Sequence, residues 1–102
     1  MENNEDADQN TSTMWIADFT INEPLHEAAS SISATYSRMA VNFPDTPSAK
    51  AWDEQALIWH RYYSGINKMN FKTKEEGESE IKRISEINKE VLATEQNLIK
   101  NN

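Results

Sequence analysis

Residues that interrupt regular backbone structure are scarce in this chain, which has only two glycines and three prolines among its 102 residues. Folds with many β-turns need such residues at most of their turns, whereas long helices need few of them. Cysteine is absent, so there is no disulfide framework, no thiolate metal site and no thiol nucleophile. The sequence therefore predicts one all-α domain built from a few long helices, because a chain of this length suffices for a single domain.

Apolar material for a core is limited. Leu, Ile, Val and Phe together account for 18 residues, which is close to the fraction at which chains stay disordered. The three Trp, three Tyr and four Met must supply much of the packing, or a partner subunit must supply the rest. We expect a small helical hairpin or three-helix bundle with an extended N-terminal arm, assembled into a homo-oligomer.

Negative charge is concentrated at the N-terminus. Residues 1–37 contain seven acidic residues and no Lys or Arg, so this first third carries the whole formal charge of −7. That charge disfavours binding to duplex nucleic acid. Residues 1–13 have the composition of a flexible acidic tail, and residues 14–102 make up the single helical domain. The tail is either a solvated, solubilising segment or an arm that docks on a basic partner surface.

The sequence carries no sign of a secretory or membrane destination. Its N-terminus is acidic where a signal peptide would be basic, and no apolar run approaches the roughly 20 residues of a membrane span. We expect a cytoplasmic protein without a membrane partner.

Apolar residues recur at helical spacing in three segments. These segments predict helices at about residues 24–42, 47–69 and 73–100. Residues 14–21 instead alternate apolar and polar positions, which predicts an extended arm, and no second strand is evident.

Local signals mark where two of the predicted helices begin. Pro24 suits the first turn of the first helix, with Asn22 or Glu23 as its cap. Thr73 and Glu76 have the spacing of a capping box at the start of the third helix.

The middle of the second predicted helix is unusually apolar. Residues 56–63 are apolar or aromatic over most of the helix circumference. Such a helix is central in a fold or shared between subunits, because a small monomer would otherwise leave a large apolar area in water. We expect Leu57, Ile58, Trp59 and Tyr63 to form a subunit interface.

Groups suited to catalysis are sparse. The two histidines, His26 and His60, lie in different predicted helices, and the Glu23-x-x-His26 run has no matching Glu-x-x-His elsewhere. Asp53 and His60 share a helix face but lie about 10 Å apart along the axis. Phosphate-loop and nucleophile motifs are absent from the sequence. We therefore predict a protein that is not an enzyme and has no catalytic residue, metal site or cofactor.

A ligand-binding constellation occurs at residues 59–63, Trp-His-Arg-Tyr-Tyr. Aromatic planes interleaved with a guanidinium suit a nucleotide, because stacking contributes about 1–3 kcal/mol per base and Arg binds phosphate. Arg38 of the first predicted helix could add positive charge. In the alternative interpretation, Trp59 and Tyr63 belong to the core and Tyr62 to an interface, which is the commoner use of aromatic residues at helical spacing.

Three short motifs between residues 18 and 66 resemble a phage-encoded family of helical hairpins. They are Phe19-Thr20 followed by Pro24, Phe43-Pro44-Asp45-Thr46, and Glu54-Gln55-Ala56-Leu57-Ile58-Trp59, and they are similar to the family pattern Phe-Thr-Tyr…Pro, Cys-Pro-Asp-Ser and Glu-Glu-Ala-x-x-Trp. The family includes anti-CBASS and anti-Thoeris sponges, which sequester cyclic nucleotide signals of bacterial immunity. The resemblance implies an oligomeric hairpin with its ligand site between subunits, although Ile21 stands where the family has a ligand-stacking Tyr.

Besides a purely structural role in an assembly, two functional hypotheses follow. In the first, the chain is a non-enzymatic phage-type anti-defence protein that binds and sequesters a cyclic nucleotide immune signal. The residues expected to line that site are Arg38, Arg61, Tyr62, Trp15 and Phe19. In the second, it is a small acidic inhibitor or adaptor that occupies the surface of a host protein with its helical faces and its acidic arm.

Overall fold

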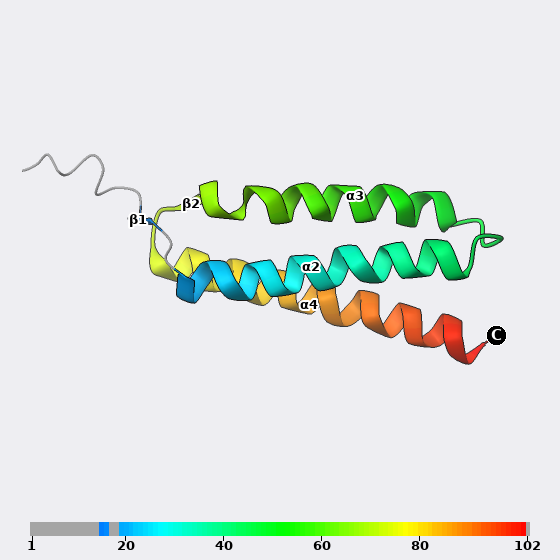
Figure 1. Ribbon diagram of the computed structural model, residues 1–102. Coiled ribbons are helices and arrows are strands. Elements are labelled where there is room, and N and C mark those ends of the chain that lie inside the picture. The colour runs from blue at the N-terminus through cyan, green and yellow to red at the C-terminus, as the bar shows by residue number, and fades with distance from the viewer. Residues whose placement is uncertain (1–14, 17–18, 102) are drawn as a thin grey trace, which may run out of the picture.

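The computed structural model describes residues 15–16 and 19–101, and three long helices dominate it (Figure 1). They are α2 (Phe19–Asn42), α3 (Ala49–Gly65) and α4 (Lys74–Lys100). A short 3₁₀ helix, η1 (Ile66–Lys68), continues α3. The prediction of an all-α helical bundle is confirmed.

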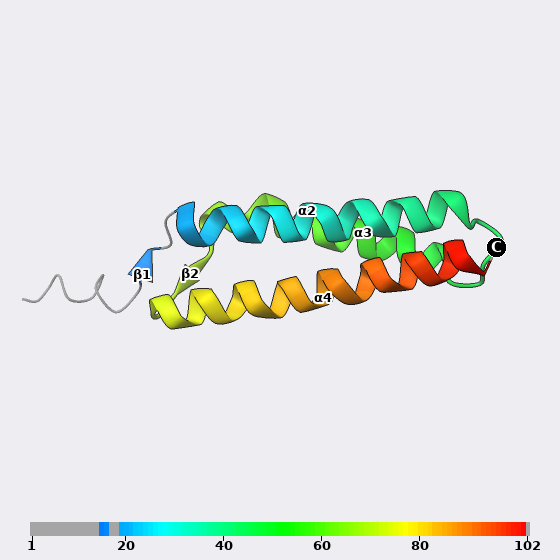
Figure 2. The ribbon, with the colours of Figure 1, turned by 90° about the horizontal axis from the view of Figure 1, so that it is seen from below.

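Helix α2 is the central element of the bundle. It packs along both of the other helices, whereas α3 and α4 have few contacts with each other. In Figure 1 α3 lies above α2 and α4 passes behind and below it, and in Figure 2 α4 lies below α2 while α3 runs partly behind it. The chain reverses direction between α2 and α3, so these two helices are antiparallel, while α4 runs in the same direction as α2. The side of α3 that faces away from α4 therefore carries no covering helix in the described structure.

Helix α2 begins at Phe19 and not at residue 24 as predicted, and Pro24 lies within it. A proline removes one helical hydrogen bond but has the φ of a helix, and tertiary packing holds the turn before it. Ile21, only 2% exposed, lies against Gly77 of α4, where a Cβ would approach Ile21 Cγ2 to 3.3 Å. The expected caps, Asn22 and Glu23, are therefore internal to the helix, and the expected extended arm is helical from Phe19 onward.

A short pair of strands closes one end of the bundle. β1 (Trp15–Ile16) pairs antiparallel with β2 (Asn70–Phe71), with Trp15 opposite Phe71. The expectation that no second strand exists is thus wrong, because a two-residue strand is too short to produce visible alternation. The rest of the predicted arm before Phe19, and the predicted acidic tail at residues 1–13, lie outside the described residues.

The other helix boundaries lie close to those predicted. Helix α3 is shorter than expected, because the chain tightens into η1 after Gly65 and turns extended at Met69, with ψ of 143°. Helix α4 starts one residue after its Thr73 cap, whose Oγ1 accepts a hydrogen bond from the Glu76 N–H at 3.2 Å. Glu76 in turn accepts one from the Lys72 N–H at 2.8 Å. The predicted capping signal is therefore confirmed.

The core lies along α2, where it meets α3, η1, β2 and α4. Its buried apolar residues come mainly from α2, with others from η1, β2 and α4, and they are Ile21, Leu25, Ala28, Ala29, Ile32, Met39, Ile66, Phe71, Ile84 and Val91. In α3 only Ala56 is fully buried. Trp52, Trp59 and Tyr62 of α3 pack against this core while remaining partly accessible.

Candidate binding surfaces

Helix α3 exposes apolar side chains on two flanks. Leu57 is 49% exposed, Ile58 is 50% exposed and Tyr63 is 39% exposed. These are three of the four side chains predicted to form an interface, and all three are accessible to a partner. The fourth, Trp59, is directed toward the core and stacks at a tilt on Tyr62, with ring centroids 5.3 Å apart. The alternative interpretation placed Tyr63 in the core and Tyr62 at an interface, but Tyr62 packs against the core and Tyr63 is exposed.

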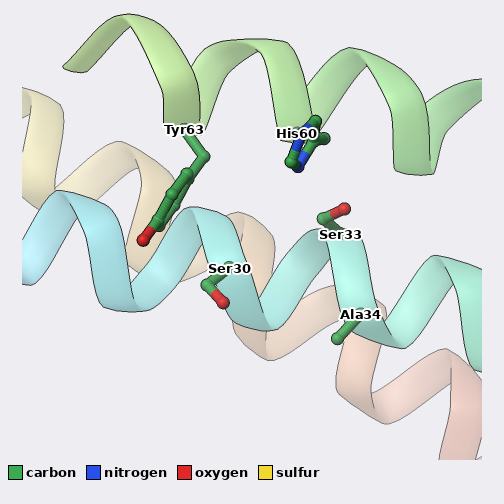
Figure 3. Close-up of a pocket in the computed structure, with 5 residues that line it drawn as sticks. All are labelled: Ser30, Ser33, Ala34, His60 and Tyr63. Carbon is green, nitrogen blue, oxygen red and sulfur yellow. The ribbon is translucent and has the colours of Figure 1, made fainter.

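A groove runs between α2 and α3 on the flank of Leu57. It consists of two adjoining hollows of about 290 and 340 Å³, which share Ser33 and His60. The residues that define this α2/α3 groove are Ser30, Ser33, Ala34 and Ser37 of α2 and Asp53, Leu57, His60 and Tyr63 of α3. Figure 3 shows Tyr63 and His60 reaching from α3 toward α2, above Ser30, Ser33 and Ala34.

The small residues of α2 explain why the groove exists. Ser33 Oγ donates a hydrogen bond to the Ala56 carbonyl oxygen at 2.8 Å, which joins the two helices where both side chains are small. Short side chains allow helix axes to approach closely but leave space unfilled beside the contact. The signal that could have located the groove is the recurrence of small residues at Ser30, Ser33, Ala34 and Ser37, which share one side of α2.

Three rings form a row along the edge of the groove. His26 meets Tyr63 edge to face, with centroids 4.9 Å apart and planes at 61°. Tyr63 is nearly parallel to His60, at 6.4 Å and 11°. The row combines aromatic faces with imidazole nitrogens, so it can stack on flat groups and also form hydrogen bonds.

Tyr62 faces the opposite flank of α3 and joins α3 to α4. Its hydroxyl donates a hydrogen bond to Glu80 Oε2 at 2.6 Å, and Glu80 also accepts two from Arg83, at 3.0 and 2.8 Å. Burial raises the pKa of Tyr62 well above its usual value, and the bond to Glu80 adds to the effect. The Arg83 bond is the largest cause of a lowered pKa at Glu80. Tyr62 therefore stays protonated and acts as a donor to a carboxylate.

Arg38 is engaged in a structural ion pair. Its guanidinium donates hydrogen bonds to both carboxylate oxygens of Glu95, at 2.9 and 3.0 Å, and to Thr35 Oγ1 at 3.0 Å. Glu95 is only 6% exposed, and the bond from Arg38 lowers the pKa of its carboxyl group. This pair joins α2 to α4.

The residues predicted to line a ligand site are dispersed among these environments. Arg38 points to α4 and Tyr62 bonds Glu80, while Arg61 of α3 is exposed. Phe19 is 73% exposed at the start of α2, about 28 Å along the helix from Arg38. The side chain of Trp15 lies outside what the structure describes. Of the predicted constellation, it is His60 and Tyr63 that line a hollow.

Comparison with models of protein families, with curated proteins and with solved structures finds no match for this chain. Within residues 15–16 and 19–101, no three His, Asp or Glu side chains are grouped so that they could hold a metal ion. Across the same residues, none of the helices combines the length and apolar character needed to cross a membrane.

Proposed function

We propose that this chain is a non-catalytic protein that binds another protein, as an inhibitor or adaptor, and that α3 supplies the contact surface. The observation that carries the proposal is that every large apolar or aromatic side chain of α3 keeps part of its surface in water, and Ala56 alone in this helix is fully buried. Removing such surface from water is the main driving force of protein association.

The flank of Ile58 has the composition of a protein-binding surface. Ile58 shares one face of α3 with Gln55 and Tyr62, which lie one turn away on either side. Tyr62 links this face to the Glu80–Arg83 pair of α4. We name these five residues the Ile58 surface. Tyrosine and arginine dominate binding hot spots, and here both are held in place by hydrogen bonds before a partner arrives.

A second candidate function is the sequestration of a cyclic nucleotide by a phage-type anti-defence protein. The observation that favours it is the row of His26, Tyr63 and His60 beside the hollow of about 290 Å³. Rings of this kind stack on bases at about 1–3 kcal/mol per base. Arg61 follows His60 in sequence and has no ion pair among the described residues, so it would be available to a phosphate.

The primary proposal is tested with Ile58→Lys and a matched control, Ile99→Lys, because Ile99 is also half exposed but lies near the end of α4. Partners captured from host extract on the full chain are identified by mass spectrometry, then purified for titration. We expect Ile58→Lys to weaken binding at least ~10-fold, or about 1.4 kcal/mol, and Ile99→Lys to leave it unchanged. Equal binding by both variants would refute the role of the Ile58 surface.

The second candidate is tested by calorimetric titration of the full chain with cyclic di- and trinucleotides. Binding heat that Tyr63→Ala abolishes and Ile58→Lys preserves would assign the groove to a nucleotide. The absence of heat with every nucleotide would exclude this function.

A further inference from the structure

The α2/α3 groove contains an unfilled hole of the kind that helix packing normally fills. Ser30, Ser33, Ala34 and Ser37 stand at positions i, i+3, i+4 and i+7, the four residues that surround a hole in knobs-into-holes packing. His60 and Tyr63 border this region without closing it, which leaves the two hollows open to solvent. Since all four hole residues are small, the hole has room for a large aliphatic side chain from a facing helix.

We propose that the α2/α3 groove is the contact surface between two copies of this chain, in which Leu57 of each copy occupies the hole of the other. Leu57 is half exposed and lines the second hollow, so it already lies at the rim of the groove. A contact made twice by the same residues closes into a symmetric dimer and leaves no open end for further copies.

The register of α2 and α3 brings the two parts of this contact to the same height. The Ser33–Ala56 hydrogen bond and the His26–Tyr63 ring contact set that register. Because the helices are antiparallel, this register places Leu57 at the level of Ile32, between Ser30 and Ser33 and so within the length of the hole. A two-fold axis parallel to the helices relates two copies in which each residue lies at the same height along that axis. It places α3 of one copy against α2 of the other. Leu57 then faces the hole, and the two hairpins form an antiparallel four-helix bundle.

Charges complement one another in the same arrangement. In this register Arg61 lies at the level of Ala28, so in the dimer it comes beside Glu27 of the second copy. Both side chains are exposed, and neither has an ion-pair partner among the residues that the structure describes. The symmetry forms the Glu27–Arg61 contact twice. Opposite charges at matched positions specify register and partner, whereas like charges there are unfavourable.

This contact is separate from the Ile58 surface. Leu57 and Ile58 are consecutive, so they project from α3 about 100° apart. The dimer covers the Leu57 flank and leaves two Ile58 surfaces free. The inference therefore does not rest on the proposed function, and either can fail while the other holds.

A charge-swap experiment on the full chain tests the dimer, with sedimentation velocity from about 1 to 200 µM as the readout, since mass action makes the dimer fraction depend on concentration. We expect the unchanged protein to become dimeric within this range. Glu27→Arg and Arg61→Glu should each raise the dissociation constant at least ~10-fold by setting like charges opposite each other. The double variant, Glu27→Arg with Arg61→Glu, should restore the original value, because the pair is re-formed with its signs exchanged.

Two further variants separate this interface from general hydrophobic association. Leu57→Asp should give a monomer, and Ile58→Asp, its neighbour on the other flank, should remain dimeric. Circular dichroism confirms that each variant stays helical, as expected for exposed positions. A monomer for the unchanged chain throughout the range, or a double variant as weak as the single ones, would overturn the proposal.

Discussion

Replacing Arg38 with Met should destabilise the bundle by about 2 kcal/mol. The substitution keeps most of the aliphatic length but removes three hydrogen bonds and leaves the buried carboxylate of Glu95 without its cation. An exposed ion pair contributes about 0–1 kcal/mol and breaking a buried one costs about 3–5 kcal/mol. This pair lies between those limits, because the Arg38 side chain is 49% exposed while that of Glu95 is 8% exposed.

The effect should depend on pH in a defined direction. Arg38 lowers the pKa of Glu95 below its ordinary value of 4.5, so the stabilisation is fully present above that value and is lost as the pH falls through the lowered pKa. The unchanged protein and Arg38→Met should therefore differ near neutral pH and converge in strong acid. Adding Glu95→Leu to Arg38→Met should recover most of the loss, since no unpaired charge then remains buried.

Urea unfolding followed by tryptophan fluorescence provides the measurement, with all variants at one protein concentration because any self-association adds to apparent stability. A free energy of unfolding for Arg38→Met within about 0.5 kcal/mol of the unchanged chain at neutral pH would refute the reasoning. So would a loss of the same size at neutral pH and in strong acid.

Three other substitutions should change the free energy of unfolding, two of them lowering it and one raising it. Tyr62→Phe should lower the free energy of unfolding by about 1–2 kcal/mol, because Glu80 loses a donor, and in a spectrophotometric titration it should remove a phenol that ionises above the usual pKa of 10. Gly65→Ala should raise stability by about 0.5–1 kcal/mol, since a Cβ there meets nothing within 4 Å. Gly77→Ala should lower it despite the same gain in helix propensity, because its Cβ would meet the buried Ile21 at 3.3 Å. Equal shifts for the two glycines in urea unfolding would contradict the packing described at Gly77.

Sequence patterns predicted the helices wherever the signal was local. The cap at Thr73 and the periodic apolar residues of α4 depend on neighbours within a few turns, so the start of α4 was correct to within one residue. The start of α2 was misplaced because Pro24 looks like a helix start, while the turn before it is held by a residue of α4 far along the chain. Strand β2 was missed for the same reason, since its partner lies at Trp15–Ile16.

The sequence likewise predicted some features of the candidate surfaces and not others. Composition and periodicity identified α3 as too apolar to be fully covered in a small bundle, and Leu57, Ile58 and Tyr63 are indeed accessible. Periodicity could not show that Arg38 is bound to Glu95, because the two residues are 57 positions apart and meet only when α4 lies beside α2. Periodicity also could not show that the other predicted ligand residues point in different directions, because that too depends on how the helices pack.

By itself the sequence determined the helical class, the number of long helices and the shortage of core material, because these follow from residue types and from spacing within single helices. The tertiary structure alone decided which side of each helix is covered. Only packing against α2 reveals that Tyr62 faces Glu80, that Tyr63 stays at the surface, and that four small residues of α2 leave an open hole beside Leu57. Which side of a helix is covered depends on residues that are distant along the chain, and the spacing of residues within one helix does not predict those contacts.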